Sequence, residues 1–249
     1  MLSKNKIKQI LSLARKKERD ETLLFVAEGN KTVTDLLPLF RCQTLVVTEK
    51  FRETLPGFQA EEIIIATKEE IKKASQLNTP QSALAVFYQQ EYTLDVTSLK
   101  DKLSIMLDTI QDPGNLGTII RIADWFGIEE VICSSETVDV YNPKTIQATM
   151  GAVGRVRVHY CDLCNLLDEI PGVPLFGTFL QGKNIFCDYL PPNGILLMGN
   201  EGNGISPQLE SRVTEKLFIP NFPIGRKTSE SLNVAVATAI ACSEFRRRV

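Results

Sequence analysis

SIMLDTIQDPGNLGTIIRIADWFG, residues 104–127, joins a short apolar run to a helical pattern through a turn at residues 112–114. The run ends at Asp108, and apolar residues then recur with helical spacing from Leu116 to Ala123. Strands separated by helices in this way are typical of α/β proteins, and strands that are apolar throughout indicate burial on both faces. We therefore predict an α/β fold with a largely parallel sheet.

The same alternation extends along the whole chain. The predicted strands are residues 44–49, 62–66, 82–88, 104–109, 130–135, 155–160, 174–180, 194–199 and 216–220. The predicted helices are residues 3–18, 29–39, 68–77, 115–127, 142–152, 162–169, 207–214 and 230–247. A length of 249 residues is compatible with one or two domains, and the polar stretch 89–102 has the composition of a linker. We predict a small α/β domain at 1–95 and a larger one at 96–249.

The net charge of −2 hides an uneven distribution along the chain. Residues 1–52 contain 11 Lys/Arg and 6 Asp/Glu, residues 53–95 contain 3 and 7, and residues 96–249 contain 14 and 17. An apolar stripe from Ile7 to Ala14 predicts an amphipathic helix in the basic segment. Its basic face is either simply solvated or holds nucleic-acid phosphates, because charge neutralisation supplies most non-specific affinity. The basic residues largely off the stripe are Lys4, Lys8, Arg15 and Lys16.

Several classes of protein are disfavoured by composition. No apolar run reaches the roughly 18 residues of a membrane-spanning helix, and no signal-peptide pattern is present. The Lys-led start differs from the Arg- and Ser-rich pattern of organelle transit peptides. Six scattered cysteines indicate free thiols, so we expect a cytoplasmic protein.

Two further segments place polar residues directly after predicted strands. In GILLMGNEGNGISPQLE, residues 194–210, a buried strand leads into a glycine-rich loop, where the backbone can approach a ligand closely. In KLFIPNFPIGRKTSESLNVAVATAIACSEF, residues 216–245, a polar loop leads from Pro220 into a helix that is apolar nearly all round, so we expect it to be buried in the core or at a subunit interface. Ligands of open α/β sheets bind at the carboxyl ends of strands, so we expect the site there.

Four polar residues near these ends allow structural as well as functional interpretations. Asn115 and Ser231 are both suited to the N-cap of a helix. Asn233, at the mouth of the apolar helix, needs a backbone or ligand partner. Arg121 lies in an otherwise apolar helix, and because burying an unpaired arginine is costly, we expect it to face a cleft.

Together the three segments resemble the SpoU-type (TrmH-type) RNA methyltransferases of the SPOUT superfamily. The shared motifs are D-x-x-x-D-P-x-N-x-G-x-x-x-R, then M-G-x-E-G-x-G, then I-P followed by S-L-N-V. NPKTIQATMGAV, residues 142–153, is similar to the family's intermediate segment, with Thr149 where serine is usual. FVAEG and TPQSALAVF resemble the family's RNA-binding N-terminal domain, with Ser82 in place of glycine. The loop between Pro220 and Ser231 is longer than in the family pattern.

The resemblance implies S-adenosylmethionine as methyl donor and an RNA ribose 2′-hydroxyl as acceptor. It also implies a C-terminal trefoil knot and a homodimer whose interface builds the active site, with no metal and no membrane partner. Ribosomal RNA is favoured by the extra N-terminal domain, and transfer RNA is the alternative. The implied catalytic residues are Asn115, Arg121, Glu201, Ser231 and Asn233. The implied cofactor-binding residues are Leu197, Met198, Gly199, Gly202, Ile219, Pro220 and Leu232.

The motif arginine has been proposed as a general base in the family, which would give Arg121 that role. Guanidinium is essentially always protonated, so our hypothesis is that Arg121 acts chiefly by electrostatics. It would orient a neighbouring phosphate or stabilise the developing alkoxide.

Two other classes of protein were weighed against this interpretation. A zinc enzyme could be built on His159, Cys161 and Cys164, but the sequence offers no second cluster of ligands. A non-catalytic RNA-binding protein with the same fold would be expected to have lost Arg121, Glu201 or Asn233, and all three are present.

Overall fold

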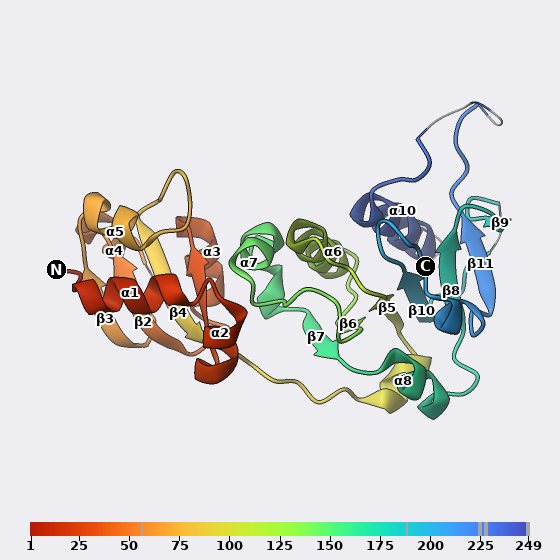
Figure 1. Ribbon diagram of the computed structural model, residues 1–249, viewed down its shortest axis with the longest axis horizontal. Helices are drawn as coiled ribbons and strands as arrows, with labels where there is room; N and C mark the ends of the chain where they lie inside the picture. Colours follow the sequence, from red (N-terminus) through yellow and green to blue (C-terminus); the bar gives the residue numbers. More distant parts are fainter. Residues whose placement is uncertain (56, 188, 224–225, 227–228, 248–249) are drawn as a thin grey trace. The chain divides into compact units, whose positions relative to one another are not determined.

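A computed structural model describes residues 1–55, 57–187, 189–223, 226 and 229–247. Contacts between residues divide the chain into two compact units (Figure 1). Unit 1 comprises residues 1–91 and 139–155, and unit 2 comprises residues 92–138 and 156–249. The first crossing, at residues 91–92, lies close to the predicted boundary at 95–96. The chain then returns to unit 1 for residues 139–155 before completing unit 2.

Unit 1 is built on a four-stranded mixed sheet with the order β1-β4-β2-β3. Strand β4 (Ala83–Tyr88) is antiparallel to both β1 (Leu24–Glu28) and β2 (Cys42–Val47), whereas β2 and β3 (Ala60–Ile65) are parallel. The carboxyl ends of β1, β2 and β3 and the amino end of β4 therefore share one edge of this sheet.

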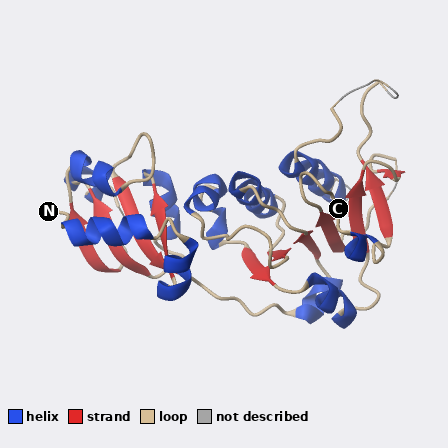
Figure 2. Ribbon diagram, in the orientation of Figure 1, coloured by secondary structure: helices blue, strands red, loops and turns tan. Residues whose placement is uncertain are grey.

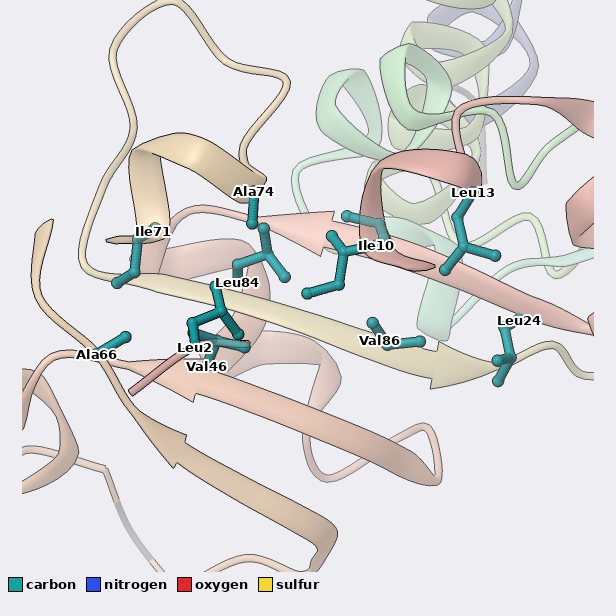
Figure 3. Close-up of a cluster of buried hydrophobic side chains, with 11 residues drawn as sticks. Leu2, Ile10, Leu13, Leu24, Val46, Ala66, Ile71, Ala74, Leu84 and Val86 are labelled. Atoms are coloured by element: carbon teal, nitrogen blue, oxygen red, sulfur yellow. The ribbon is translucent and has the colours of Figure 1, made fainter. Parts of the chain in front are cut away.

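Helices α1 (Lys4–Ser12) and α5 (Lys68–Ala74) contribute to a buried apolar cluster over the sheet of unit 1 (Figure 3). The side chains that meet in it include Ile10, Leu13, Ile71, Ala74, Leu24, Val46, Leu84 and Val86. The predicted helix 3–18 is in fact two helices, because the chain is extended at Arg15 before α2 (Lys16–Thr22) begins. Strand β1 was not predicted, although all five of its residues are buried.

The segment 139–155 is an integral part of unit 1. It carries α7 (Pro143–Thr149) and the 3-10 turn Ala152–Gly154, and α7 contacts β1. The Tyr141 ring lies 4.7 Å from that of Phe25, within an aromatic cluster that also includes Phe40 and Phe87. Arg19, only 1% exposed, donates two hydrogen bonds to Asp139, at 2.6 and 2.8 Å. The fold of unit 1 therefore depends on residues far along the chain.

Unit 2 contains a seven-stranded sheet with the order β7-β6-β5-β10-β8-β11-β9, in which every described pairing is parallel. This confirms the predicted α/β class (Figure 2). The order of the strands does not show whether the chain is knotted, so the trefoil knot stays a prediction. The strands are β5 (Leu103–Leu107), β6 (Glu130–Cys133), β7 (Arg157–Tyr160), β8 (Leu175–Phe179), β9 (Lys183–Asn184), β10 (Gly194–Met198) and β11 (Glu215–Phe218).

Helices α6 (Pro113–Trp125) and α10 (Val234–Arg246) of unit 2 pack against each other. A second apolar cluster joins β5 and β10 to the 3-10 helix Val96–Lys100, α8 (Leu163–Glu169) and the short α9 (Pro207–Glu210). The remaining elements are α3 (Asn30–Leu36) and α4 (Glu49–Arg52) in unit 1. None of the helices in the described ranges is long and apolar enough to cross a membrane.

The last helix is not buried all round within the single chain, so the expectation that its remaining apolar face is buried at a subunit interface stays a prediction. Val234, Ala241 and Cys242 are buried, but Val236 is 50% exposed and Ile240 is half-buried. Sequence gives the apolar character of a helix, whereas the covering of each face depends on which other elements pack there.

Candidate active site

The candidate site lies where neighbouring parallel strands of unit 2 end. Strand β5 leads into Asp108, β10 into Gly199 and β11 into Ile219. These strands lie close together in the order β5-β10-β8-β11, and parallel strands bring their carboxyl ends to the same edge of a sheet. The three sequence segments that carry the motifs therefore meet at this edge.

The glycine-rich loop after β10 is closed by its own hydrogen bonds. Backbone groups of Asn200 and Gly204 bond to each other at 2.9 Å, and the Asn200 side-chain oxygen accepts from Gly202 and Asn203. A side chain at Gly199 would overlap the backbone of Gly204 and Ile205, so this close approach requires glycine.

Strand β5 holds this loop through two contacts. The buried Asp108 carboxylate accepts a hydrogen bond from the Ser206 backbone N–H at 2.7 Å. The Asn200 amide donates to the Thr109 carbonyl oxygen, also at 2.7 Å. Asp108 and Asn200 were not among the predicted site residues, although Asp108 ends a predicted strand and opens the first motif.

A chain of side-chain hydrogen bonds connects the three motif segments. The Asn115 amide nitrogen donates to Glu201 Oε1 at 2.8 Å, and Asn115 Oδ1 accepts from the Asn233 amide nitrogen at 2.9 Å. Asn233 Oδ1 in turn accepts from the backbone N–H groups of Ala235 and Val236. These bonds fix the orientation of both side-chain amides, because in each the nitrogen donates to one partner and the oxygen accepts from another. We call Glu201, Asn115 and Asn233 the amide–carboxylate network.

Two helix caps differ from the predictions. Asp112, not Asn115, is the N-cap of α6, because its carboxylate accepts from the Asn115 backbone N–H and Pro113 occupies the first turn. Asn233, not Ser231, is the N-cap of α10. Both corrections release the predicted residue from a capping role: Asn115 makes its side-chain bonds within the network, and Ser231 is exposed.

A cavity of about 940 Å³ opens beside the network. Several predicted site residues line it: Met198, Gly199, Glu201, Gly202, Ile219, Ser231 and Leu232. Apolar walls come from Phe179, Leu180 and Val234, none of which was predicted as a site residue, although the first two end a predicted strand and Val234 closes the third motif. Leu197, fully buried in β10, and Pro220 lie outside the described lining, as do Asn115, Arg121 and Asn233.

Arg121 is exposed on α6 and lies outside the lining of this cavity, so the expectation that it faces a cleft stays a prediction. Thr118, Arg121 and Trp125 share one face of α6, and Trp125 is 84% exposed. Leu116, Ile119, Ile120 and Ala123 form the buried face instead. Within the described part of the chain, Arg121 forms no ion pair, so its charge is available to a ligand.

The residues considered for zinc have other contacts. His159 Nε2 lies 2.7 Å from Glu130 Oε2, and both side chains are 6% exposed. Burial alone would raise the pKa of Glu130, but hydrogen bonds from His159 and Arg157 lower it to about 2. Cys161 and Cys164, the second of which belongs to α8, are partly buried against the second apolar cluster. No group of three metal-ligating side chains occurs among the residues that the structure describes.

Comparison with protein-family models gives two matches. Residues 102–243 match the SpoU rRNA methylase family, and residues 4–85 match the MRM3-like substrate binding domain. Among curated proteins, the chain is 32% identical over 248 residues to the 23S rRNA (guanosine(2553)-2′-O)-methyltransferase RlmP of Bacillus subtilis. That alignment covers 97% of this chain and 96% of the relative.

Comparison with solved structures also finds RNA methyltransferases. A TrmH-family protein of Porphyromonas gingivalis aligns with a TM-score of 0.89 and 39% identity over 100% of both chains. An AdoMet-bound rRNA methyltransferase of Sinorhizobium meliloti aligns with a TM-score of 0.84 and 32% identity, over 100% of this chain and 97% of the other.

Proposed function

Because the chain belongs to the SpoU rRNA methylase family, we propose that it transfers a methyl group from S-adenosylmethionine to a ribose 2′-hydroxyl of RNA. The observation that carries this proposal is the amide–carboxylate network, which joins all three motif segments beside one cavity and reaches its lining through Glu201. Ribosomal RNA is the proposed substrate, since RlmP acts on 23S rRNA and aligns along nearly the whole chain.

The cavity suits the cofactor in size and chemistry. Its volume of about 940 Å³ lies within the range of about 300–1,000 Å³ for small-molecule sites. Phe179, Leu180 and Leu232 offer apolar surface for a purine ring, and the glycine loop exposes backbone groups for polar atoms. Bound there, S-adenosylmethionine supplies a methyl group on a positively charged sulfur. The residues proposed to hold it are Met198, Gly199, Gly202, Ile219 and Leu232, with Leu197 and Pro220 supporting from behind the lining.

The protein's own contribution is chiefly alignment. Methyl transfer to a hydroxyl is an in-line displacement, and holding two reactants in line can supply about 7–11 kcal/mol of the barrier. Asn115, Glu201 and Asn233 fix one another, so their free polar atoms are preorganised toward the ribose. Glu201 and Ser231 reach the cavity wall and are proposed to contact the reactants directly.

Arg121 is proposed to act by electrostatics on the RNA. A guanidinium presents a rigid fork of donors that matches a phosphate, and it does not give up its proton. The exposure of Arg121 and the absence of an ion pair within the described residues leave it free for this contact. It would orient the phosphate next to the target ribose or stabilise the developing alkoxide.

A second copy of the chain is the proposed cover for the outer faces of α6 and α10. This proposal is supported by Trp125, 84% exposed, and Val236, 50% exposed, because a second copy would remove both apolar side chains from water. Light scattering coupled to size exclusion tests this: wild type should elute as a dimer and the double variant Trp125→Glu/Val236→Glu as a monomer. A monomeric wild type would contradict the dimer. A cytoplasmic setting is proposed from the six free cysteines.

The central test maps 2′-O-methyl sites in ribosomal and transfer RNA from cells lacking this protein and from wild type. We expect one ribosomal site to lose its methyl group. Loss of a methyl group from a transfer-RNA site instead would show that transfer RNA is the substrate. An unchanged map would contradict the proposal that the protein is an RNA methyltransferase. Calorimetry with S-adenosylmethionine separates the remaining alternative, because a non-catalytic RNA-binding protein would give no binding heat.

A further inference from the structure

Unit 1 contains its own cavity, of about 880 Å³, at the shared edge of its sheet. Asn30 follows the end of β1, Thr48 follows β2, Thr67 follows β3, and Ser82 precedes β4. The antiparallel placement of β4 is what brings Ser82 to the same edge as the other three. Polar side chains from four separate strands therefore converge on one space.

The polar floor of this cavity is preorganised. Asn30 Oδ1 accepts from the Ser82 backbone N–H at 2.9 Å, and the Asn30 backbone N–H donates to Gln81 Oε1 at 2.7 Å. The first bond fixes the Asn30 amide with its nitrogen as the remaining donor. The loop that carries Gln81 and Ser82 is anchored again at its start, where Glu28 accepts from the Gln76 backbone at 2.9 Å.

Seven of the eleven basic side chains in residues 1–52 form ion pairs within the protein. The ion pairs are Lys6–Glu62, Arg15–Glu18, Lys16–Asp20, Lys17–Glu21, Arg19–Asp139, Lys31–Asp35 and Arg41–Glu61. Much of the basic charge that the sequence concentrates in residues 1–52 is therefore unavailable as a phosphate-binding face. Lys50 and Lys68 are exposed and form no ion pair with a described carboxylate, as is also the case for Lys4, Lys8, Lys72 and Lys73.

Lys50 and Lys68 line the cavity, together with the half-buried ring of Phe51. Two carboxylates also line it: Glu70 is engaged by the backbone N–H groups of Thr67 and Leu2, and Glu49 is exposed. Ammonium groups suit a phosphate, an aromatic ring suits a base, and amide and carboxylate groups suit the polar edge of a base.

We propose that this cavity binds one unpaired nucleotide of the substrate RNA, with the flanking phosphates on Lys50 and Lys68 and the base beside Phe51 and Asn30. The proposal rests on the RNA substrate proposed above and assigns a recognition site to unit 1. An unpaired nucleotide is required because a base within a duplex cannot expose its faces and polar edge to a cavity.

The test measures binding of the full-length protein to a labelled single-stranded 12-nucleotide RNA of mixed sequence and to the same strand in a duplex. The variant is Lys50→Ala/Lys68→Ala. The matched control is Lys72→Ala/Lys73→Ala, which removes the same charge from exposed lysines of α5 outside the described lining. We expect the cavity variant to bind the single strand about tenfold more weakly, with a salt slope smaller by about 2. The control and the duplex should change much less.

Equal losses for variant and control would overturn the cavity site, because they would show only a diffuse charge effect. A second measurement needs no variant: 4-thiouridine placed in the single strand should crosslink to peptides containing residues 48–54 or 81–82. Crosslinks confined to other peptides would contradict the proposal. Failure of the proposed function is distinguishable, because it would appear in wild type as absent S-adenosylmethionine binding, whatever the behaviour of the lysine variant.

Discussion

The two cavities lie at the edges of two sheets of different kind, and their linings differ accordingly. In unit 2 every described strand pairing is parallel, and the cavity is lined by backbone, apolar side chains and Glu201, together with Glu230 and a lysine, Lys216, that is paired with Glu210. In unit 1 an antiparallel strand brings Ser82 to the edge, and two unpaired lysines line the cavity. The parallel edge holds groups suited to a small cofactor, and the mixed edge holds groups suited to a polyanion. The comparison predicts that changes in unit 2 affect turnover, whereas changes at the unit 1 cavity affect RNA affinity.

The largest expected effect is on turnover, from Asn115→Ala. Asn115 does not cap its helix, so its loss removes the middle of the network while the fold is retained. Removing one preorganised polar group of this kind lowers kcat by about 10²–10³. Single-turnover methyl transfer measures it, with Asn165→Ala on an exposed helix position of α8 as the control. If Asn115→Ala turns over at the wild-type rate, the amide–carboxylate network does not contribute to catalysis.

The next largest effect is on stability, from Tyr141→Ala. Tyr141 is 8% exposed, its ring packs on Phe25, and its hydroxyl bonds to the Gln90 carbonyl oxygen at 2.9 Å. Removing a buried aromatic side chain lowers the free energy of unfolding by about 3 kcal/mol or more. Urea unfolding measures the loss, and Tyr189→Ala, 69% exposed, is the control. Equal stability of the two variants would mean that unit 1 does not depend on residues 139–155.

A smaller effect is expected from Arg121→Lys, which keeps the charge but removes the planar fork. If Arg121 clamps a phosphate, kcat/KM falls about tenfold and the pH profile keeps its shape. The pH dependence of methyl transfer measures both properties. If Arg121→Lys keeps most of the turnover but shifts the pH profile, the phosphate clamp is wrong. Such a result would mean that the residue at position 121 exchanges a proton during the reaction.

The smallest effect separates two neighbouring positions. Asn233→Ala should lower the free energy of unfolding by about 1 kcal/mol, because Asn233 caps α10. Ser231→Ala should leave it within about 0.5 kcal/mol, because Ser231 is exposed and caps nothing. Both are measured in one urea series, and calorimetry should show weaker S-adenosylmethionine binding for Ser231→Ala. Equal losses of stability in the two variants would contradict the assignment of the helix cap to Asn233 alone.

Much of unit 2 could be predicted because its strands are short, apolar and separated by turn residues. The segment 104–127 shows how far this extends: strand, turn and helix were all predicted, but the cap was assigned to Asn115 instead of Asp112. Both residue types cap helices, and the signal that favours Asp112 is Pro113 directly after it, because proline is common at the first helical position. Arg121 was predicted to face a cleft and not the core, but its surroundings could not be predicted, because the apolar period gives the buried face of α6 but not whether another element covers the opposite one.

Contacts between distant segments set the other limit. Residues 142–153 were recognised by their resemblance to a family segment, but nothing local indicates that Tyr141 joins Phe25 or that Asp139 pairs with Arg19. Ion pairs of basic residues with carboxylates far along the chain could not be predicted either, because nothing in the local sequence indicates them. A sum over residues 1–52 counts Arg19 as free charge, whereas in the fold this residue is buried in an ion pair.

The return of residues 139–155 to unit 1 has a consequence for synthesis on the ribosome. Chains are made from the N-terminus at about 5–20 residues per second, so roughly 3–13 s separate the appearance of residue 91 from that of residue 155. During that interval Arg19 has no carboxylate from residue 139, and the Phe25 ring lacks its Tyr141 neighbour. The nascent N-terminal segment therefore waits, with part of its aromatic core uncovered, until translation has passed well into the catalytic unit.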